Sequence, residues 1–154
     1  VNIGDILHMG PDGNGNYKEV KVKSIQCKRV PIETAISGHY VCFGIKKLIK
    51  KQIKKGMVLV SKENKKAIKK FNAEIIILKS HHTTIRKNYQ PILHVNNITQ
   101  AAKIINIKNN VKILRIGDKR EVSFEFVNRP VYINIGDRIL FREGRLRVII
   151  IIIN

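Results

Sequence analysis

The chain has 154 residues, of which 44% are hydrophobic, so it can bury a sizeable core and is not expected to be disordered. Lys and Arg number 30 against 11 Asp and Glu, and the resulting net charge of +19 favours a polyanionic partner. Nucleic acid is the first expectation and an acidic membrane surface the second. The longest apolar run, Val148 to Ile153, is far too short to span a bilayer.

In chain order, the first half predicts short strands separated by turns. Alternating or apolar segments predict strands at residues 6–9, 20–27, 40–45 and 57–60, whereas residues 30–36 predict an irregular segment broken by Pro31. Residues 46–55 carry lysines around an apolar face and could form a basic amphipathic helix. An isolated helix of that length is marginal in water, so we favour one helical turn with solvated lysines.

The second half follows the same pattern after a Lys-rich segment. Strands are predicted at residues 73–78, 91–95, 98–107, 111–114, 121–127, 139–141 and 147–153. We therefore predict an all-β fold of two antiparallel β-barrels with at most short helical turns. The predicted boundaries are a first barrel at 1–64, a linker at 65–70 and a second barrel at 71–154.

The triplet Ile-Gly-Asp occurs at residues 3–5, 116–118 and 135–137, each time ahead of an apolar run. Gly tolerates the positive φ of a tight turn, and Asp can bond the backbone that follows it. Each triplet therefore predicts a turn from which a strand begins.

Cys27 and Cys42 lack the spacing of a zinc site, so we expect reduced cysteines in a cytoplasmic protein. The abundance of Ile, Lys and Asn is typical of an AT-rich genome, such as that of a large virus or a eukaryotic parasite. For a viral protein, the expected location is the cytoplasm of the host. The same bias is an alternative explanation of part of the Lys excess. The sequence begins at Val1, at a turn signal and without Met, which suggests a piece of a longer chain.

Several motifs of the second half resemble the C-terminal barrel of translational GTPases. They are Phe71 with Ala73, Glu74 and residues 75–78, then His82 with Thr83, then Lys87, Tyr89 and Pro91, and finally residues 116–118 and 141–145. In this order they resemble the elongation factor Tu and 1-alpha superfamily, and most of all its GTP-binding protein 1-like family. Ile150 departs from the pattern where a Gly is expected, which suggests a tighter or shifted last strand.

The first half resembles the middle barrel of the same proteins, with its opening strands missing. The matching residues are Gly4 with Asp5, Ser37 and Gly38 before Val41, and Ile49, Ile53, Gly56, Met57 and Val58. Tyr40 stands where elongation factors of the Tu type carry Asn, which argues against close recognition of an aminoacyl group.

The resemblance implies that the intact protein binds GTP and Mg²⁺ and hydrolyses GTP in a domain absent from this chain. No GxxxxGK[ST] loop is present here, so we expect neither catalysis nor a cofactor in this part. The implied partners are RNA, meaning tRNA at the ribosome, and the protein's own nucleotide-binding domain. RNA binding would be coupled to the nucleotide state of that domain. A membrane is not an expected partner.

The resemblance also implies which residues contact RNA. They are Arg142, Glu143, Gly144 and Arg145 at the tRNA T stem, His82, Thr83, Lys87 and Tyr89 as a second contact, and Lys28 and Arg29 at the acceptor end. The alternatives are a surface turn, a polar loop and a solvated strand end. Neither metal ligands nor catalytic groups are expected, because adjacent histidines diverge and the three Asp of the triplets lie in turns.

Two other functions remain open at this point. The chain could be a stand-alone basic β-barrel that binds nucleic acid with no GTPase partner. It could also be a membrane-surface module that uses residues 46–55.

Overall fold

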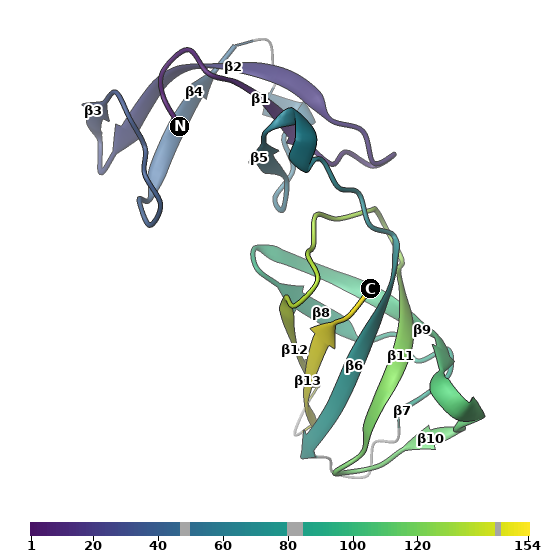
Figure 1. Cartoon of the computed structure of the whole chain (residues 1–154). Helices are drawn as coiled ribbons and strands as arrows, with labels where there is room; N and C mark the ends of the chain where they lie inside the picture. Colours follow the sequence, from purple (N-terminus) through teal and green to yellow (C-terminus); the bar gives the residue numbers. More distant parts are fainter. Residues whose placement is uncertain (47–49, 80–84, 144–145) are drawn as a thin grey trace.

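The computed structural model describes residues 1–46, 50–79, 85–143 and 146–154. Strands dominate, and the described helical segments are three 3-10 turns: η1 (Lys50–Gln52), η2 (Lys62–Asn64) and η3 (Lys108–Asn110). Two β-structured parts follow each other along the chain (Figure 1). The predicted all-β class is confirmed.

The first part is a five-stranded antiparallel sheet. Its strands are β1 (Ile6–Gly10), β2 (Lys18–Cys27), β3 (Val30–Ile32), β4 (Val41–Ile45) and β5 (Val58–Val60). They lie in the order β3-β2-β1-β5, with β4 also paired to β2. The predicted alternation is observed from Val20 to Lys23, where the valines are buried and the lysines exposed. It was wrong for the next two residues: Ile25 is buried and Ser24 exposed, because a register shift lies between Val22 and Ser24.

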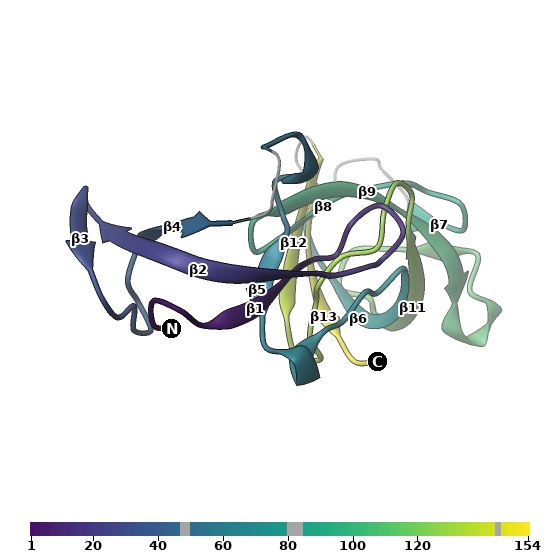
Figure 2. The same cartoon turned by 90° about the horizontal axis from the view of Figure 1, so that it is seen from above.

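The second part is a closed barrel with the strand order β11-β6-β13-β12-β8-β9 (Figures 1 and 2). Its strands are β6 (Lys70–Lys79), β8 (Ile92–Val95), β9 (Ile98–Ile107), β11 (Lys119–Phe126), β12 (Arg138–Glu143) and β13 (Leu146–Ile152). A separate pair, β7 (Ile85–Arg86) and β10 (Ile113–Leu114), lies beside it. Strand β7 was not predicted, because it is short and follows a polar stretch.

Three phenylalanines occupy the centre of the barrel core. The rings of Phe71 and Phe124 stack with centroids 5.3 Å apart, and Phe126 lies 5.0 Å from Phe71. Phe124 and Phe126 are fully buried. Aromatic rings of this size dominate the free energy that burial contributes.

The three Ile-Gly-Asp triplets form the same turn three times. Gly4, Gly117 and Gly136 have φ of 97°, 82° and 86°. In each turn the Asp N–H donates to the carbonyl of the residue three positions earlier, at 3.1–3.2 Å. The Asp carboxylate accepts from that residue's own N–H, at 2.6–2.9 Å. The carboxylate thus bonds the preceding backbone, whereas the sequence analysis expected the following backbone.

Each turn also starts a strand pair. The Gly N–H donates to a buried residue of the neighbouring strand, and that residue's N–H donates back to the Asp carbonyl, at 2.8–3.2 Å. The partners are Val22 on β2, Ile77 on β6 and Ile152 on β13. The bonds continue into the ladders β1–β2, β11–β6 and β12–β13. The turns therefore set the register of three strand pairs.

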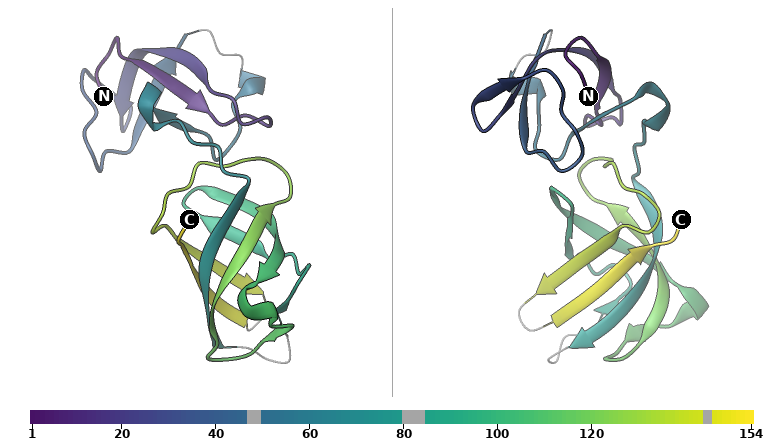
Figure 3. Two further views of the ribbon diagram at one scale, coloured as in Figure 1. Left: turned by 45° about the vertical axis from the view of Figure 1, so that its right-hand side comes forward. Right: turned by 60° about the vertical axis from the view of Figure 1, so that its left-hand side comes forward.

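Strand β13 is paired on both sides, with β12 and with β6 (Figure 3). Ile150, which replaces the expected Gly, is fully buried and fills the core. A register shift lies between Arg147 and Val148 rather than at Ile150. The apolar run of β13 has both of its backbone edges covered.

Part of the predicted linker joins the barrel. Ile68 and Val131 exchange two backbone hydrogen bonds of 2.9 and 3.0 Å, and the Lys69 ammonium donates to the carbonyls of Val127 and Asn128. The domain boundaries at 64 and 71 stay predictions.

Specific hydrogen bonds connect the two parts. The Tyr17 hydroxyl donates to the carbonyl of Lys66 at 2.5 Å, and the Lys66 ammonium donates to Asn134 at 2.7 Å. The Arg129 guanidinium donates to the carbonyl of Lys55. Gly56, with a φ of 92°, lies where a Cβ would press on Ile98 of the barrel. The first sheet is thereby held against the loops at one end of the barrel.

We expect Gly117→Ala to lower the free energy of unfolding by about 1 kcal/mol, because Ala disfavours a positive φ. A Cβ at this position would meet no atom within 4 Å, so the loss reports conformation alone. Gly13→Ala is the control, since its surroundings are also open but its φ is outside the left-handed region. Urea unfolding measures both variants, and equal stabilities would contradict the role of the turn.

We expect Phe124→Ala to destabilise the barrel by about 3–5 kcal/mol, because it leaves a cavity among stacked rings. Leu140→Ala serves as the control, since Leu140 is 57% exposed; its change should stay within about 1 kcal/mol. Thermal unfolding followed by circular dichroism tests this, and similar losses for the two variants would contradict the assigned core.

Candidate functional site

The structure describes only part of the predicted RNA-contact set. Arg142 and Glu143 end strand β12, where Arg142 pairs with Arg147 of β13. Gly144 and Arg145 lie outside the described residues, as do His82 and Thr83. Contact of these residues with RNA stays a prediction from the sequence.

Lys87 and Tyr89 lie in the turn after β7. Asn88 has a φ of 70°, and the Tyr89 N–H donates to the carbonyl of Arg86 at 3.1 Å. This turn leaves Lys87 exposed, whereas the Tyr89 ring packs 6.0 Å from the Phe141 ring of the core. Tyr89 is therefore partly buried against the barrel core, and its predicted contact with RNA stays a prediction.

A cleft opens beside Lys87, with a volume of about 260 Å³. We call it the basic cleft; it is lined by Arg86, Lys87, Asn106, Ile107, Val111 and Lys112. The pairing of β7 with β10, in which Arg86 lies opposite Ile113, brings its two sides together. The cleft combines an apolar floor with three cationic side chains and one amide.

The charges of the basic cleft are not compensated within the described part of the chain. No Asp or Glu lines it. The described ion pairs join Lys108 to Glu121 and Lys119 to Glu74, so they involve none of its three cations. Three like charges around a small cleft repel one another, and a bound anion would relieve this repulsion. A guanidinium and an amide can also donate hydrogen bonds to phosphate oxygens.

Lys28 and Arg29 form a second cationic feature at the tip of the β2–β3 hairpin. Cys27 pairs with Val30, so these two residues make the whole connection. Their φ values are 50° and 70°, which is the geometry of a type I′ turn that usually takes Asn-Gly. Long side chains in this region cost free energy, and such strain is commonly kept at functional sites. Both side chains are exposed.

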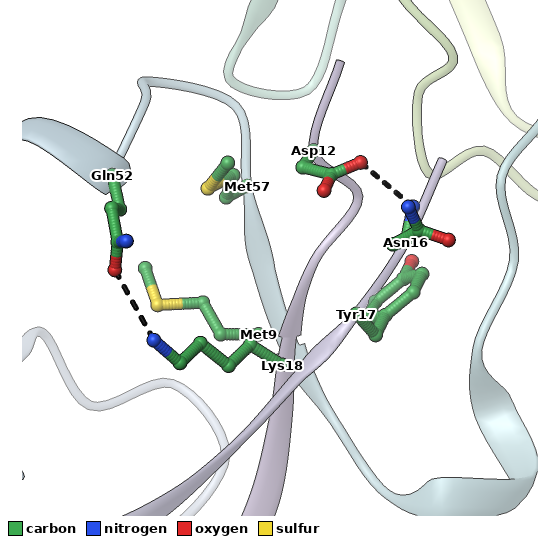
Figure 4. A pocket seen from close by; sticks show the side chains of 7 residues that line it. All are labelled: Met9, Asp12, Asn16, Tyr17, Lys18, Gln52 and Met57. Atoms are coloured by element: carbon green, nitrogen blue, oxygen red, sulfur yellow. Dashed lines mark hydrogen bonds between the residues drawn. The ribbon is translucent and has the colours of Figure 1, made fainter. Parts of the chain in front are cut away.

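A pocket of about 290 Å³ lies in the first part, at the start of β2 (Figure 4). We call it the Met-Tyr pocket; its lining residues are Met9, Asp12, Asn16, Tyr17, Lys18, Gln52 and Met57. Desolvation of the Tyr17 hydroxyl raises the pKa of that group. Sequence reasoning missed this pocket, because its lining residues lie on β1, β2 and the segments around them and meet only in the folded sheet.

The Asp12 carboxylate fixes the loop beside the Met-Tyr pocket. It accepts hydrogen bonds from the N–H groups of Asn14 and Asn16, both at 2.8 Å. These backbone bonds, that of Asn16 first, hold the pKa of Asp12 below its usual value of 3.8. The loop therefore presents an ionised carboxylate at neutral pH.

The described residues show neither a metal site nor a membrane-spanning helix. Within residues 1–46, 50–79, 85–143 and 146–154, no group of three or more His, Cys, Asp or Glu could hold a metal ion. In the same ranges no helix is long and apolar enough to cross a membrane.

Comparison with known proteins places the barrel in a family. Residues 64–153 match the family model described as the elongation factor Tu C-terminal domain. GTP-binding protein 1 of Xenopus laevis is 40% identical over 150 residues, which cover 97% of this chain and 22% of that protein. GTP-binding protein 2 of Mus musculus is 37% identical over 142 residues, which cover 92% of this chain and 23% of that protein.

The chain thus spans between a fifth and a quarter of the length of these relatives. The matched family model covers more than half of the chain and coincides with the closed barrel. The family predicted from the sequence motifs is therefore confirmed: the chain belongs to the elongation factor Tu C-terminal domain family.

Proposed function

We propose that this chain is the RNA-holding part of a cytoplasmic, translation-factor-like GTPase. Its two parts bind RNA, above all tRNA at the ribosome. They couple that binding to the nucleotide state of a separate domain, which binds GTP and Mg²⁺ in the intact protein. The relatives that are named GTP-binding proteins support the link to GTP.

The uncompensated basic cleft carries this proposal. Arg86, Lys87 and Lys112 line one cleft beside the barrel, and among the residues that the structure describes no carboxylate lines it. Each cation that neutralises a phosphate releases a condensed counterion, so such a cluster favours a polyanion. Duplex RNA is recognised mainly through its phosphates and 2′-hydroxyls, and a shallow basic cleft suits such contacts.

The exposed hairpin of Lys28 and Arg29 supports a second RNA contact on the first part. Its cations are kept in a backbone conformation that their side chains disfavour. A surface that served only solubility could carry the same charges at no conformational cost. The hairpin therefore agrees with the acceptor-end contact that the family resemblance implies.

The hydrogen bonds between the parts support the proposed coupling. The Arg129 guanidinium of the barrel donates to the carbonyl of Lys55 in the first part. Lys66 of the linker bonds both parts, because its carbonyl accepts from Tyr17 and its ammonium donates to Asn134 of the barrel. If docking of the nucleotide-binding domain displaces one of the two parts, these hydrogen bonds make the other part move with it as a rigid body.

The direct test is tRNA binding by a triple variant, Arg86→Gln, Lys87→Gln and Lys112→Gln. The slope of log affinity against log salt concentration is negative, and we expect it to become shallower by about two units, because up to three phosphate contacts are lost. Filter binding or fluorescence anisotropy over a range of salt concentrations measures this slope.

A charge-matched variant, Lys21→Gln, Lys23→Gln and Lys62→Gln, serves as the control. It removes three exposed lysines that lie outside the cleft. If both triple variants lose the same affinity and slope, binding follows total charge and the cleft has no specific role. A full gene with no GTP-binding domain would instead favour a stand-alone nucleic-acid-binding barrel.

A further inference from the structure

We propose that the Met-Tyr pocket binds a single unpaired nucleobase of an RNA strand. This inference rests on the proposed RNA binding, but it concerns a different part of the molecule and different contacts. The basic cleft belongs to the barrel, whereas the Met-Tyr pocket belongs to the first sheet and the loop of residues 10–16.

The pocket is also distinct from the acceptor-end contact expected at Lys28 and Arg29. Lys18 begins β2, and Lys28 follows its last residue, Cys27. A ten-residue strand extends about 30 Å, so the two features lie at opposite ends of β2. One nucleotide cannot occupy both places.

The walls of the pocket suit a flat aromatic ligand. Met9, Met57 and the Tyr17 ring supply thioether and aromatic surface (Figure 4). The Tyr17 ring is fixed, because its hydroxyl donates to the carbonyl of Lys66. Methionine adapts its shape to a ligand, while a fixed aromatic ring offers a stacking face that needs no further ordering. A volume of about 290 Å³ has room for one heterocyclic base.

Polar groups lie on two sides of this apolar surface. Asp12 and Asn16 lie on one side, and Lys18 and Gln52 lie on the other (Figure 4). The Lys18 ammonium donates to the Gln52 amide oxygen over 3.3 Å, a long bond that a ligand can replace. Nucleobase edges carry donors and acceptors together, so the carboxylate, the amides and the ammonium can each find a partner.

The charge around the pocket favours a nucleotide over an apolar protein side chain. Lys51 and Lys54 are exposed and flank Gln52 closely in the chain. The Lys54 N–H lies 3.4 Å from the Met57 sulfur, which places this backbone beside the pocket lining. These lysines can contact the phosphates that flank an inserted base, whereas an apolar peptide would leave them without a partner.

The experiment compares two short single-stranded RNAs of equal length, one intact and one in which abasic nucleotides keep the phosphates but remove the bases. Fluorescence anisotropy with the whole 154-residue chain measures both affinities. We expect the intact RNA to bind about tenfold more tightly, as for the loss of one stacked base. Tyr17→Leu should remove most of that difference, because it removes the stacking face.

Gln52→Leu is the second pocket variant, since Gln52 is exposed and its replacement does not disturb a core. Tyr40→Leu is the matched control, because Tyr40 is 89% exposed and outside the pocket; it should keep the full difference. If RNA binds equally with and without bases, or if both pocket variants keep the difference, the base pocket is refuted while RNA binding stands. If neither RNA binds, both proposals are refuted.

Discussion

The paired hydrogen bonds between each Ile-Gly-Asp turn and its neighbouring strand are the constraint on which the rest of the structure depends. A Gly with positive φ turns the chain, and the Asp carboxylate closes the turn onto the preceding N–H. The Gly N–H and the Asp carbonyl then both bond one residue of the next strand. Because a one-residue slip would move every side chain of a strand to the opposite face, these bonds decide which residues are buried.

The same constraint positions the cationic features. The turn at 116–118 begins β11 beside β6, and the residues just before it form β10, which pairs with β7. Arg86 lies on β7, and Lys112 directly precedes β10, so the two residues meet because a turn anchored in the core fixes the position of β10. In the first sheet, the turn at 3–5 aligns β1 with β2. That alignment places Met9 opposite Lys18, and both line the Met-Tyr pocket.

The sequence predicts this framework well, because its signals are local. Apolar alternation and the three triplets identify most strands and all three turns. The basic cleft could not be predicted in the same way, since Arg86, Asn106 and Lys112 lie on separate segments and meet only through pairing of two-residue strands. The Lys28-Arg29 turn also escaped prediction, because neither residue favours a positive φ. The cleft depends on contacts between distant segments, and the hairpin turn depends on a backbone conformation that its two residues disfavour. Predictions from local sequence patterns therefore miss both.

The fold also explains why few carboxylates are free to neutralise the positive charge of the surface. All four Asp of the chain accept backbone hydrogen bonds inside turns, and Glu74 and Glu121 pair with Lys119 and Lys108. More than half of the 11 acidic residues are thus engaged in holding local structure. They are held away from the cations of the cleft and of the hairpin. A polyanion that approaches these features meets cations that form no ion pair within the described part of the chain, so its phosphates need not displace any of the described carboxylates in order to bind.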